Sequence, residues 1–192
     1  MTFENVSDEE LIASAGNGDR LAASELISRH ADKIIGVCWR MLGERAAAED
    51  VAQEAFLRLW EFAPKWNPDG GARIDTWLYR VAVNRCVDRL RKTKREAPQE
   101  AAPEMADDAP SATQVLIGED RRKSVLAALE TLPERQRLAV VLCHYQELSN
   151  IEAADVMKIS VDALESLLAR GRRALKTALA PMRQELMEGL AG

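Results

Sequence analysis

The chain has 192 residues, 47% of them hydrophobic and only 5% aromatic, with a formal net charge of −5. This length suits one medium-sized domain or two small ones, and the abundance of Ala and Leu with few β-branched runs favours an all-helical fold. The sequence contains no apolar run that could span a membrane, and its acidic first ten residues do not resemble a signal peptide, so we expect a cytoplasmic protein. Its cysteines are too widely spaced to indicate a metal or redox site, and we expect reduced, buried thiols at Cys38, Cys86 and Cys143.

Four helices are predicted in the first half of the chain, at about residues 8–15, 20–42, 45–62 and 74–94. Ser7 and Glu10 have the spacing of a capping box for the first helix, and Gly43 is placed to end the second. Residues 64–71 hold two prolines and two glycines, which predicts a loop before the fourth helix.

The third helix carries more large apolar side chains than one buried face requires. A helical wheel gathers a sufficient core face on one side, formed by Val51, Ala52, Ala55, Phe56, Leu59 and Phe62. Leu57 falls on the opposite, acidic side and Trp60 on the border, ringed by Asp50, Gln53 and Glu54. An apolar pair ringed by carboxylates and an amide has the character of a docking surface for a basic partner; the alternative is a wide core stripe.

Positive charge is concentrated on the fourth helix, where residues 73–95 contain eight Arg and Lys against two Asp. With so few acids in the segment, repulsion between the basic side chains is uncompensated unless an anion binds. Nucleic-acid phosphates would supply that anion. Aromatic side chains that suit stacking on unpaired bases lie nearby, at Trp66, Trp77 and Tyr79. Two alternatives stay open: the arginines form a solvated face, and Trp77 belongs to the core. Asn84 either reads a base edge or caps a buried group, and Asp88 either orients Asn84 or pairs with a basic neighbour.

A change of composition separates two domains. Residues 96–120 contain seven acids and no base, and three prolines interrupt the same stretch. Because apolar bulk is missing, this composition predicts an extended or disordered linker at 96–118, between an N-terminal domain of residues 1–95 and a C-terminal domain of residues 119–192.

The C-terminal domain is predicted to contain four helices, at about residues 119–131, 133–147, 149–157 and 160–179. Ser149 and Glu152 have the spacing of another capping box, a short turn follows at 158–159, and Ser160 caps the last helix. This is the sequence form of a helix-turn-helix, a DNA-binding motif. The wheel of the last helix turns Gly171 and the leucines inward. Its outward, DNA-facing side is formed by Glu165, Ser166, Ala169, Arg170, Arg172, Arg173 and Lys176.

No motif of nucleotide binding, zinc peptidase or serine hydrolase chemistry occurs in the sequence. The two histidines, His30 and His144, lie in apolar helical settings that indicate structural roles. We therefore expect no enzyme, and neither a cofactor nor a metal.

Taken in order, three segments resemble the extracytoplasmic-function (ECF) branch of the sigma-70 family. "DVAQEAFLRLW" is similar to region 2.2, which docks on the β′ coiled coil of core RNA polymerase. "IDTWLYRVAVNRCVDRLRK" resembles regions 2.3 and 2.4, which open and read the −10 promoter element. "LETLPERQRLAVVLCHYQELSNIEAADVMKISVDALESLLARGRRAL" resembles region 4, whose helix-turn-helix reads the −35 element and whose surface touches the β flap. The resemblance implies an all-α protein in which a region 2 bundle and a region 4 helix-turn-helix are joined by a flexible linker.

The resemblance, together with the charge pattern, implies three sets of site residues. The polymerase-binding set is Asp50, Gln53, Glu54, Phe56, Leu57 and Trp60. The −10 set is Arg73, Trp77, Arg80, Asn84, Arg85, Asp88, Arg91 and Lys92. The −35 set is Ser160, Asp162, Glu165, Ser166, Arg170, Arg172 and Arg173. The chain departs from the family's usual Gly at Lys158, from its usual Thr at Ala163, and from Lys-Ser-Arg at residues 165–167, so the −35 sequence is not inferred.

The implied partners are core RNA polymerase, promoter DNA and an anti-sigma factor, which in this family is often membrane-anchored. The implied function is promoter-specific transcription initiation in a stress or environmental response. Two alternatives stay open: a stand-alone helix-turn-helix regulator whose first domain binds a small ligand, and a decoy that binds polymerase without opening DNA. The dense positive charge of residues 73–95 argues against the decoy.

Overall fold

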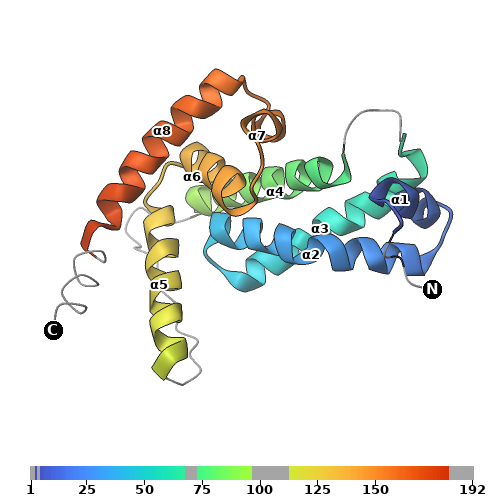
Figure 1. Ribbon diagram of the computed structural model, residues 1–192, viewed down its shortest axis with the longest axis horizontal. Helices are drawn as coiled ribbons and strands as arrows, with labels where there is room; N and C mark the ends of the chain where they lie inside the picture. Colours follow the sequence, from blue (N-terminus) through green and yellow to red (C-terminus); the bar gives the residue numbers. More distant parts are fainter. Residues whose placement is uncertain (1–2, 4, 68–72, 97–112, 182–192) are drawn as a thin grey trace.

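The computed structural model describes residues 3, 5–67, 73–96 and 113–181, with residues 113–121 described by their backbone alone. All regular structure in these residues is helical (Figure 1). The elements in chain order are α1 (Asp8–Gly16), α2 (Arg20–Leu42), α3 (Arg45–Phe62), η1 (Ala63–Lys65), α4 (Ile74–Glu96), α5 (Thr113–Glu130), α6 (Glu134–Val140), η3 (Val141–Tyr145), α7 (Asn150–Met157) and α8 (Val161–Ala178).

The local signals for helix ends act as predicted. The Ser7 hydroxyl accepts a hydrogen bond from the backbone amide of Glu10 at 3.2 Å, and the Glu10 carboxylate accepts one from the Ser7 amide at 2.9 Å. Ser149 and Glu152 repeat this reciprocal arrangement at the start of α7. Gly43 ends α2 in the left-handed conformation, with φ of 79°. These caps satisfy backbone groups that the helix itself leaves unpaired.

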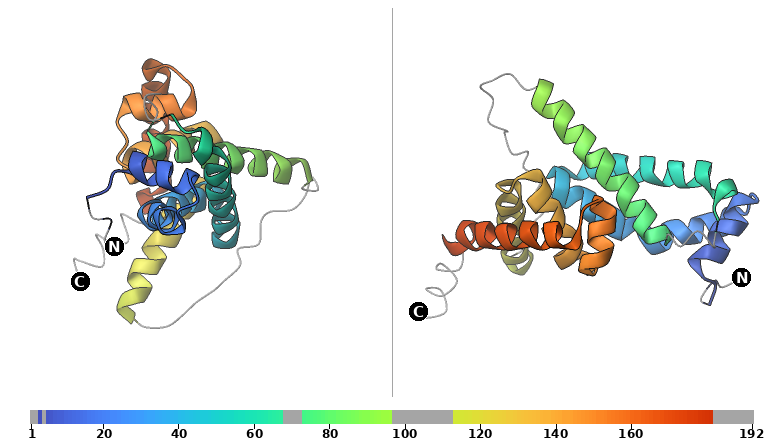
Figure 2. Two further views of the ribbon diagram at one scale, coloured as in Figure 1. Left: turned by 90° about the vertical axis from the view of Figure 1, so that its right-hand side faces the viewer. Right: turned by 90° about the horizontal axis from the view of Figure 1, so that it is seen from above.

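The N-terminal helices form a bundle. Helices α2 and α3 pack side by side, α4 crosses both, and α1 packs across one end of α2 (Figures 1 and 2). The end of α1 near α2 is tied by Asp8, which lies 2.7 Å from Nε2 of His30 and 3.0 Å from Arg29. His30 is buried, so its predicted structural role is confirmed.

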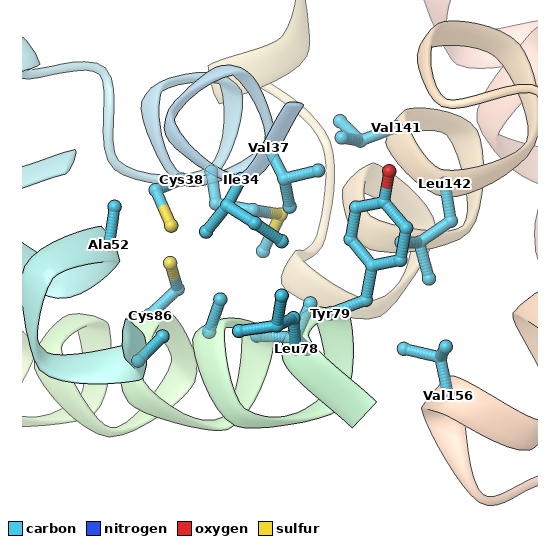
Figure 3. Packing of buried hydrophobic residues seen from close by; sticks show 14 of the residues in the cluster. Ile34, Val37, Cys38, Ala52, Leu78, Tyr79, Cys86, Val141, Leu142 and Val156 are labelled. Atoms are coloured by element: carbon cyan, nitrogen blue, oxygen red, sulfur yellow. The ribbon is translucent and has the colours of Figure 1, made fainter. Parts of the chain in front are cut away.

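The bundle core contains two of the three thiols. Cys38 of α2 and Cys86 of α4 are fully buried and their sulfur atoms point toward each other (Figure 3). Hydrogen bonding to Cys38, with burial, raises the pKa of the Cys86 thiol far above its usual range, so this sulfur remains protonated. Cys143 is half-buried rather than buried.

A thiol-reactive reagent will therefore distinguish the cysteines. In the native protein at pH 8 we expect Ellman's reagent to modify Cys143 first, at a rate slowed because burial raises the pKa of its thiol, whereas Cys38 and Cys86 react only on the timescale of unfolding. After unfolding in guanidinium chloride, all three thiols of the sequence should react quickly and at similar rates. Rapid modification of Cys86 in the folded chain would contradict the packing of this core.

The C-terminal domain differs from expectation in two places. Helix α5 begins at Thr113, whereas the sequence predicts its start near residue 119, and residues 97–112 of the predicted linker lie outside the described part. The helix predicted at 133–147 ends at Val140 and continues as a wider π-helical turn, η3. This turn keeps Val141 and Leu142 in the core while Tyr145 turns toward α2.

The two domains pack against each other in a closed arrangement. Helix α4 contacts α7, and α2 contacts α5, α6 and η3. One cluster of buried side chains crosses this interdomain seam, with Val37 and Tyr79 on one side and Val141, Leu142 and Val156 on the other (Figure 3). The Tyr79 hydroxyl donates to Gln146 at 3.1 Å.

A buried arginine spans the seam. Arg137 of α6 donates from Nη1 to the Met41 carbonyl at the end of α2 and from Nη2 to the Glu130 carbonyl at the end of α5, both at 2.7 Å. The last carbonyls of a helix lack intrahelical partners and carry partial negative charge. A single guanidinium therefore caps two helix ends, one in each domain.

The turn between α7 and α8 contains no glycine. Lys158 ends α7 with φ of 51°, a left-handed conformation that costs a residue with a side chain about 1–2 kcal/mol. We expect Lys158→Gly to raise the free energy of unfolding by about 0.5–1 kcal/mol after the added flexibility of the unfolded chain is subtracted. Urea denaturation measures this. Lys158→Ala is the matched control, because alanine keeps the same penalty, and equal stability of the two variants would contradict the explanation.

Candidate nucleic-acid and partner interfaces

The predicted docking face of α3 is exposed at its centre. Leu57 keeps 56% of its surface accessible, Gln53 is exposed beside it, and Trp60 is half-buried at the border, as the wheel predicts. Phe56 is different: only 6% of its surface is accessible, so its ring belongs to the core and offers almost no surface to a partner. An exposed Leu with polar neighbours remains as the predicted contact surface.

The acids of this face reach toward α4. Asp50 lies 3.6 Å from Arg89, and Glu54 lies 3.3 Å from Arg85. The expectation that the charge of α4 is uncompensated without an external anion is therefore wrong for this part of the helix. The anions come from neighbouring helices, which a search for i,i+4 partners within α4 does not reveal.

Two arginines at the start of α4 also lie near acids of the other domain. Arg80 of α4 lies 2.7 Å from Asp155 of α7. Arg73, which directly precedes α4, lies 2.7 Å from Asp75 of its own domain and 3.6 Å from Glu152 of α7. Hydrogen bonds from Ser149 lower the pKa of the Glu152 carboxyl, which keeps it ionised. Two predicted DNA-reading arginines are thus engaged within the protein.

An aromatic group lies where α3 gives way to α4. The ring of Trp77 stacks on Phe62, with centroids 5.4 Å apart and planes at 9°, and Trp66 meets Phe62 edge-on at 6.0 Å. The wheel assigned Phe62 to the core, but it is 37% exposed because α3 ends there and the chain turns away. Tyr79 does not join this group: it is buried at the seam, and burial raises its pKa to about 12.

The C-terminal end of α4 projects away from the other helices in both views of Figure 2. From the middle of the helix to this end, the exposed side chains include Asn84, Asp88 and Arg91. Lys92 pairs weakly with Glu96 at 3.9 Å. Within the described residues Arg91 and Asp88 form no ion pair, so the proposed pairing of Asp88 with a basic neighbour is not observed.

Helix α8, the predicted recognition helix, has the expected two-sided form. Gly171 is buried, which confirms its predicted inward position, and a Cβ there would lie 2.9 Å from Cγ2 of Val140 in α6, so glycine allows the two helices to pack closely. Glu165 accepts a hydrogen bond from Asn150 at 3.2 Å. The exposed −35 candidates are Ser160, Asp162, Glu165, Ser166, Arg170, Arg172 and Arg173.

Two members of this set have additional roles. The Ser160 hydroxyl caps α8 by accepting from the Ala163 amide at 3.2 Å. Arg172 donates to His144 at 3.1 Å, and His144 is exposed, so the prediction of an apolar setting for this histidine is wrong.

Sequence reasoning missed two contributors. Arg137 lies within the segment that resembles region 4 but is not among the predicted site residues, because its importance depends on a carbonyl of the other domain. Phe62 is signalled only by its place at a helix end before Pro64. Among the described residues, no cluster of three or more His, Cys, Asp or Glu could hold a metal ion. No helix in the same part of the chain combines the length and the apolar character that a membrane crossing requires.

Comparison with known proteins supports both domains. The Sigma-70 region 2 family matches residues 26–96, and the Sigma-70 region 4 family matches residues 122–175. The ECF RNA polymerase sigma factor SigW of Bacillus subtilis is 32% identical over 178 residues, which cover 88% of this chain and 94% of SigW. The RNA polymerase sigma-H factor of Pseudomonas aeruginosa is 29% identical over 188 residues, covering 93% of this chain and 96% of that protein.

Two solved structures share the fold. CnrH, in complex with the cytosolic domain of CnrY, matches with a TM-score of 0.68 and 24% identity over 91% of this chain and 97% of CnrH. The sigma factor RpoE, in complex with the anti-sigma factor NepR from Bartonella quintana, matches with a TM-score of 0.64 and 18% identity over 82% of this chain and 96% of RpoE. With both domains matched in order and a relative of this similarity along nearly its whole length, the chain belongs to the ECF branch of the sigma-70 family of RNA polymerase sigma factors.

Proposed function

We propose that this sigma factor binds core RNA polymerase through the exposed face of α3, reads the −10 element with α4 and reads the −35 element with α8. Sigma factors are transcription initiation factors, so the chain itself performs no catalysis and acts in the cytoplasm with polymerase. The observation that carries the proposal is the exposure of Leu57 on a helix whose opposite face already provides a complete core. An exposed Leu beside Trp60 and Gln53 has the apolar centre and polar rim of a partner contact.

The DNA-reading part of the proposal depends on exposed polar and basic side chains. Ser166 and Arg170 lie on the outer side of α8, where a hydroxyl and a guanidinium suit base edges and phosphates. On α4 the free DNA contacts are Asn84 and Arg91, and the Phe62–Trp77 stack offers an aromatic surface for an unpaired base.

We also propose an anti-sigma factor as a partner, which links the protein to an environmental signal. The structures of similar fold support this, because RpoE is in complex with the anti-sigma factor NepR. Co-purification from the native host, followed by mass spectrometry, identifies the partner.

A gel shift separates the proposal from a stand-alone regulator. A duplex promoter fragment is incubated with the sigma factor alone, with core polymerase alone and with both. We expect a specific complex only with both proteins. Tight, sequence-specific binding by the sigma factor alone would instead favour the helix-turn-helix regulator.

One substitution tests the −10 assignment. Arg91→Ala should weaken promoter binding by the holoenzyme and reduce the slope of log affinity against log salt by about one phosphate contact. The matched control is Arg45→Ala in α3, whose side chain is 75% exposed and paired with Glu49. An unchanged salt slope for Arg91→Ala would remove Arg91 from the DNA contacts.

A further inference from the structure

A cavity lies where α5 of the C-terminal domain meets α2 of the N-terminal bundle (Figure 1). Its volume is about 580 Å³, which falls within the range of small-molecule sites in proteins. The described residues that line it include none of those assigned above to polymerase or DNA. Its apolar lining comes from both domains and consists of Ile35, Trp39, Val125, Leu126 and Leu129.

Arg40 of α2 brings a positive charge to the wall of this cavity. Its Nη1 donates to the Gly36 carbonyl, one helical turn earlier, at 2.8 Å, and its guanidinium carbon lies 4.3 Å from the centroid of the Tyr145 ring. A Cβ at residue 36 would lie 2.9 Å from Nη1 of Arg40, so the glycine leaves room for the guanidinium against the helix. The side chain is therefore held at the cavity by contacts from both domains.

No carboxylate of the described residues forms an ion pair with Arg40. Asp32, the acid that lines the cavity, is exposed and lies beyond ion-pair distance of it. Burial, together with the like charge of Arg122, lowers the pKa of Arg40. A guanidinium has five N–H donors, and the acceptor seen for Arg40 in the described part of the chain is the Gly36 carbonyl. A bound anion would therefore gain charge-assisted hydrogen bonds from a half-buried cation whose donors are mostly unused.

These two properties of the cavity select a class of ligand. The apolar lining favours a hydrocarbon body, because binding removes apolar surface of both the ligand and the protein from water. The guanidinium favours a carboxylate head, whose two oxygens match its fork of donors. Arg122 adds a second positive charge from the α5 side, whereas Arg45, which also lines the cavity, is paired with Glu49. A cation or an uncharged molecule would lack the interaction with Arg40.

We propose that this cavity binds an amphipathic organic anion, with its carboxylate on Arg40 and its apolar body against Trp39 and the side chains of α5. The inference goes beyond the proposed function, because such binding needs neither polymerase nor DNA. A ligand that contacts α2 and α5 together binds the folded chain rather than the unfolded one, so it raises the melting temperature.

Isothermal titration calorimetry of the full chain with decanoate, a medium-chain fatty acid, tests the proposal. We expect saturable binding with a stoichiometry of one, accompanied by a rise in melting temperature. Decanol lacks the charge and acetate lacks the apolar body, so each should bind at least about tenfold more weakly than decanoate. No saturable binding of decanoate would overturn the proposal, as would equal affinities for decanoate and decanol.

Arg40→Gln is the main variant, since it removes the charge and keeps a polar side chain. We expect its affinity for decanoate to fall at least about tenfold and its weak affinity for decanol to stay unchanged. Arg40→Lys keeps the charge and should recover part of the lost affinity. The matched control, Arg135→Gln, removes the same charge from an exposed site outside the cavity and should bind decanoate as the wild type does. Equal losses in Arg40→Gln and Arg135→Gln would attribute binding to net charge and overturn the proposal.

A cavity-filling variant keeps the proposal testable if Arg40→Gln fails to fold. Val125 is half-buried and lines the cavity, so Val125→Phe places a larger apolar side chain where the ligand body would lie. It should abolish the rise in melting temperature that decanoate causes in the wild type. Binding of decanoate to Val125→Phe with wild-type affinity would show that the ligand lies elsewhere, and the proposed site would be wrong.

Two further measurements distinguish other occupants of the cavity. Sedimentation with phosphatidylglycerol vesicles that retain the chain, while free decanoate does not bind, would assign the cavity to a membrane surface and overturn the proposal. Weaker co-purification of a partner protein with Arg40→Gln, again without decanoate binding, would assign it to a protein interface with the same consequence. If the wild type supports transcription but does not bind decanoate, this inference fails and the proposed function stands. If it does not support transcription, calorimetry still decides whether the cavity binds the anion.

Discussion

Leu57→Ala is expected to weaken binding to core RNA polymerase by at least about tenfold while changing the melting temperature by no more than about 1 °C. The side chain is 56% exposed, so truncation removes partner contact area and leaves no internal cavity. Affinity is measured by fluorescence titration of labelled sigma factor with core enzyme, and stability by thermal unfolding followed by circular dichroism.

Leu59→Ala is the matched control, since Leu59 lies two residues away on the same helix and is fully buried. Its truncation should lower the free energy of unfolding by about 2–5 kcal/mol through loss of burial and creation of a cavity. If Leu57→Ala destabilises the protein by a similar amount, Leu57 supports the fold. The docking role assigned to the α3 face would then be wrong.

Arg137→Ala is expected to have two effects: it separates the two domains at the seam and lowers the free energy of unfolding of the C-terminal domain. The substitution leaves the carbonyls of Met41 and Glu130 without their donor, and an unsatisfied buried acceptor costs about 1–3 kcal/mol. When the domains separate, water can hydrogen-bond to the Met41 carbonyl. The substitution is therefore expected to expand the chain as well as to lower its stability. Urea denaturation and small-angle scattering measure the two effects.

The neighbouring Arg135 provides the control, because its side chain is exposed in the same helix. Arg135→Ala should leave both the denaturation midpoint and the radius of gyration close to those of the wild type. Should the Arg137 and Arg135 variants behave alike, the guanidinium of Arg137 would have no stabilising role at the seam.

Features that depend on neighbours in sequence were predictable. The capping boxes at Ser7 and Ser149 satisfy amides three residues away, and the helix bounds of the N-terminal bundle agree within two residues with those expected. The two sides of α8 and the exposure of Leu57 follow from helical periodicity alone. The wheel failed at Phe62, where the helix ends and periodicity no longer fixes the environment.

Features that depend on contacts distant in sequence were not predictable. Arg80 and Asp155 are far apart along the chain, and no pattern within α4 shows that an acid of α7 will meet it. The charge count of residues 73–95 therefore overstated how much compensating negative charge must come from a bound partner. Arg137 was missed for the same reason, because its partner carbonyl belongs to the other domain.

Run-off transcription tests the central claim most directly. The purified chain is added to core polymerase on a genomic promoter fragment located by mapping transcript starts after overexpression. We predict a transcript of defined length that requires the sigma factor, core polymerase and the intact promoter, and that is strongly reduced by Leu57→Ala. Folded protein that binds the core enzyme yet yields no promoter-dependent transcript would contradict the assignment of this chain as a promoter-specificity factor.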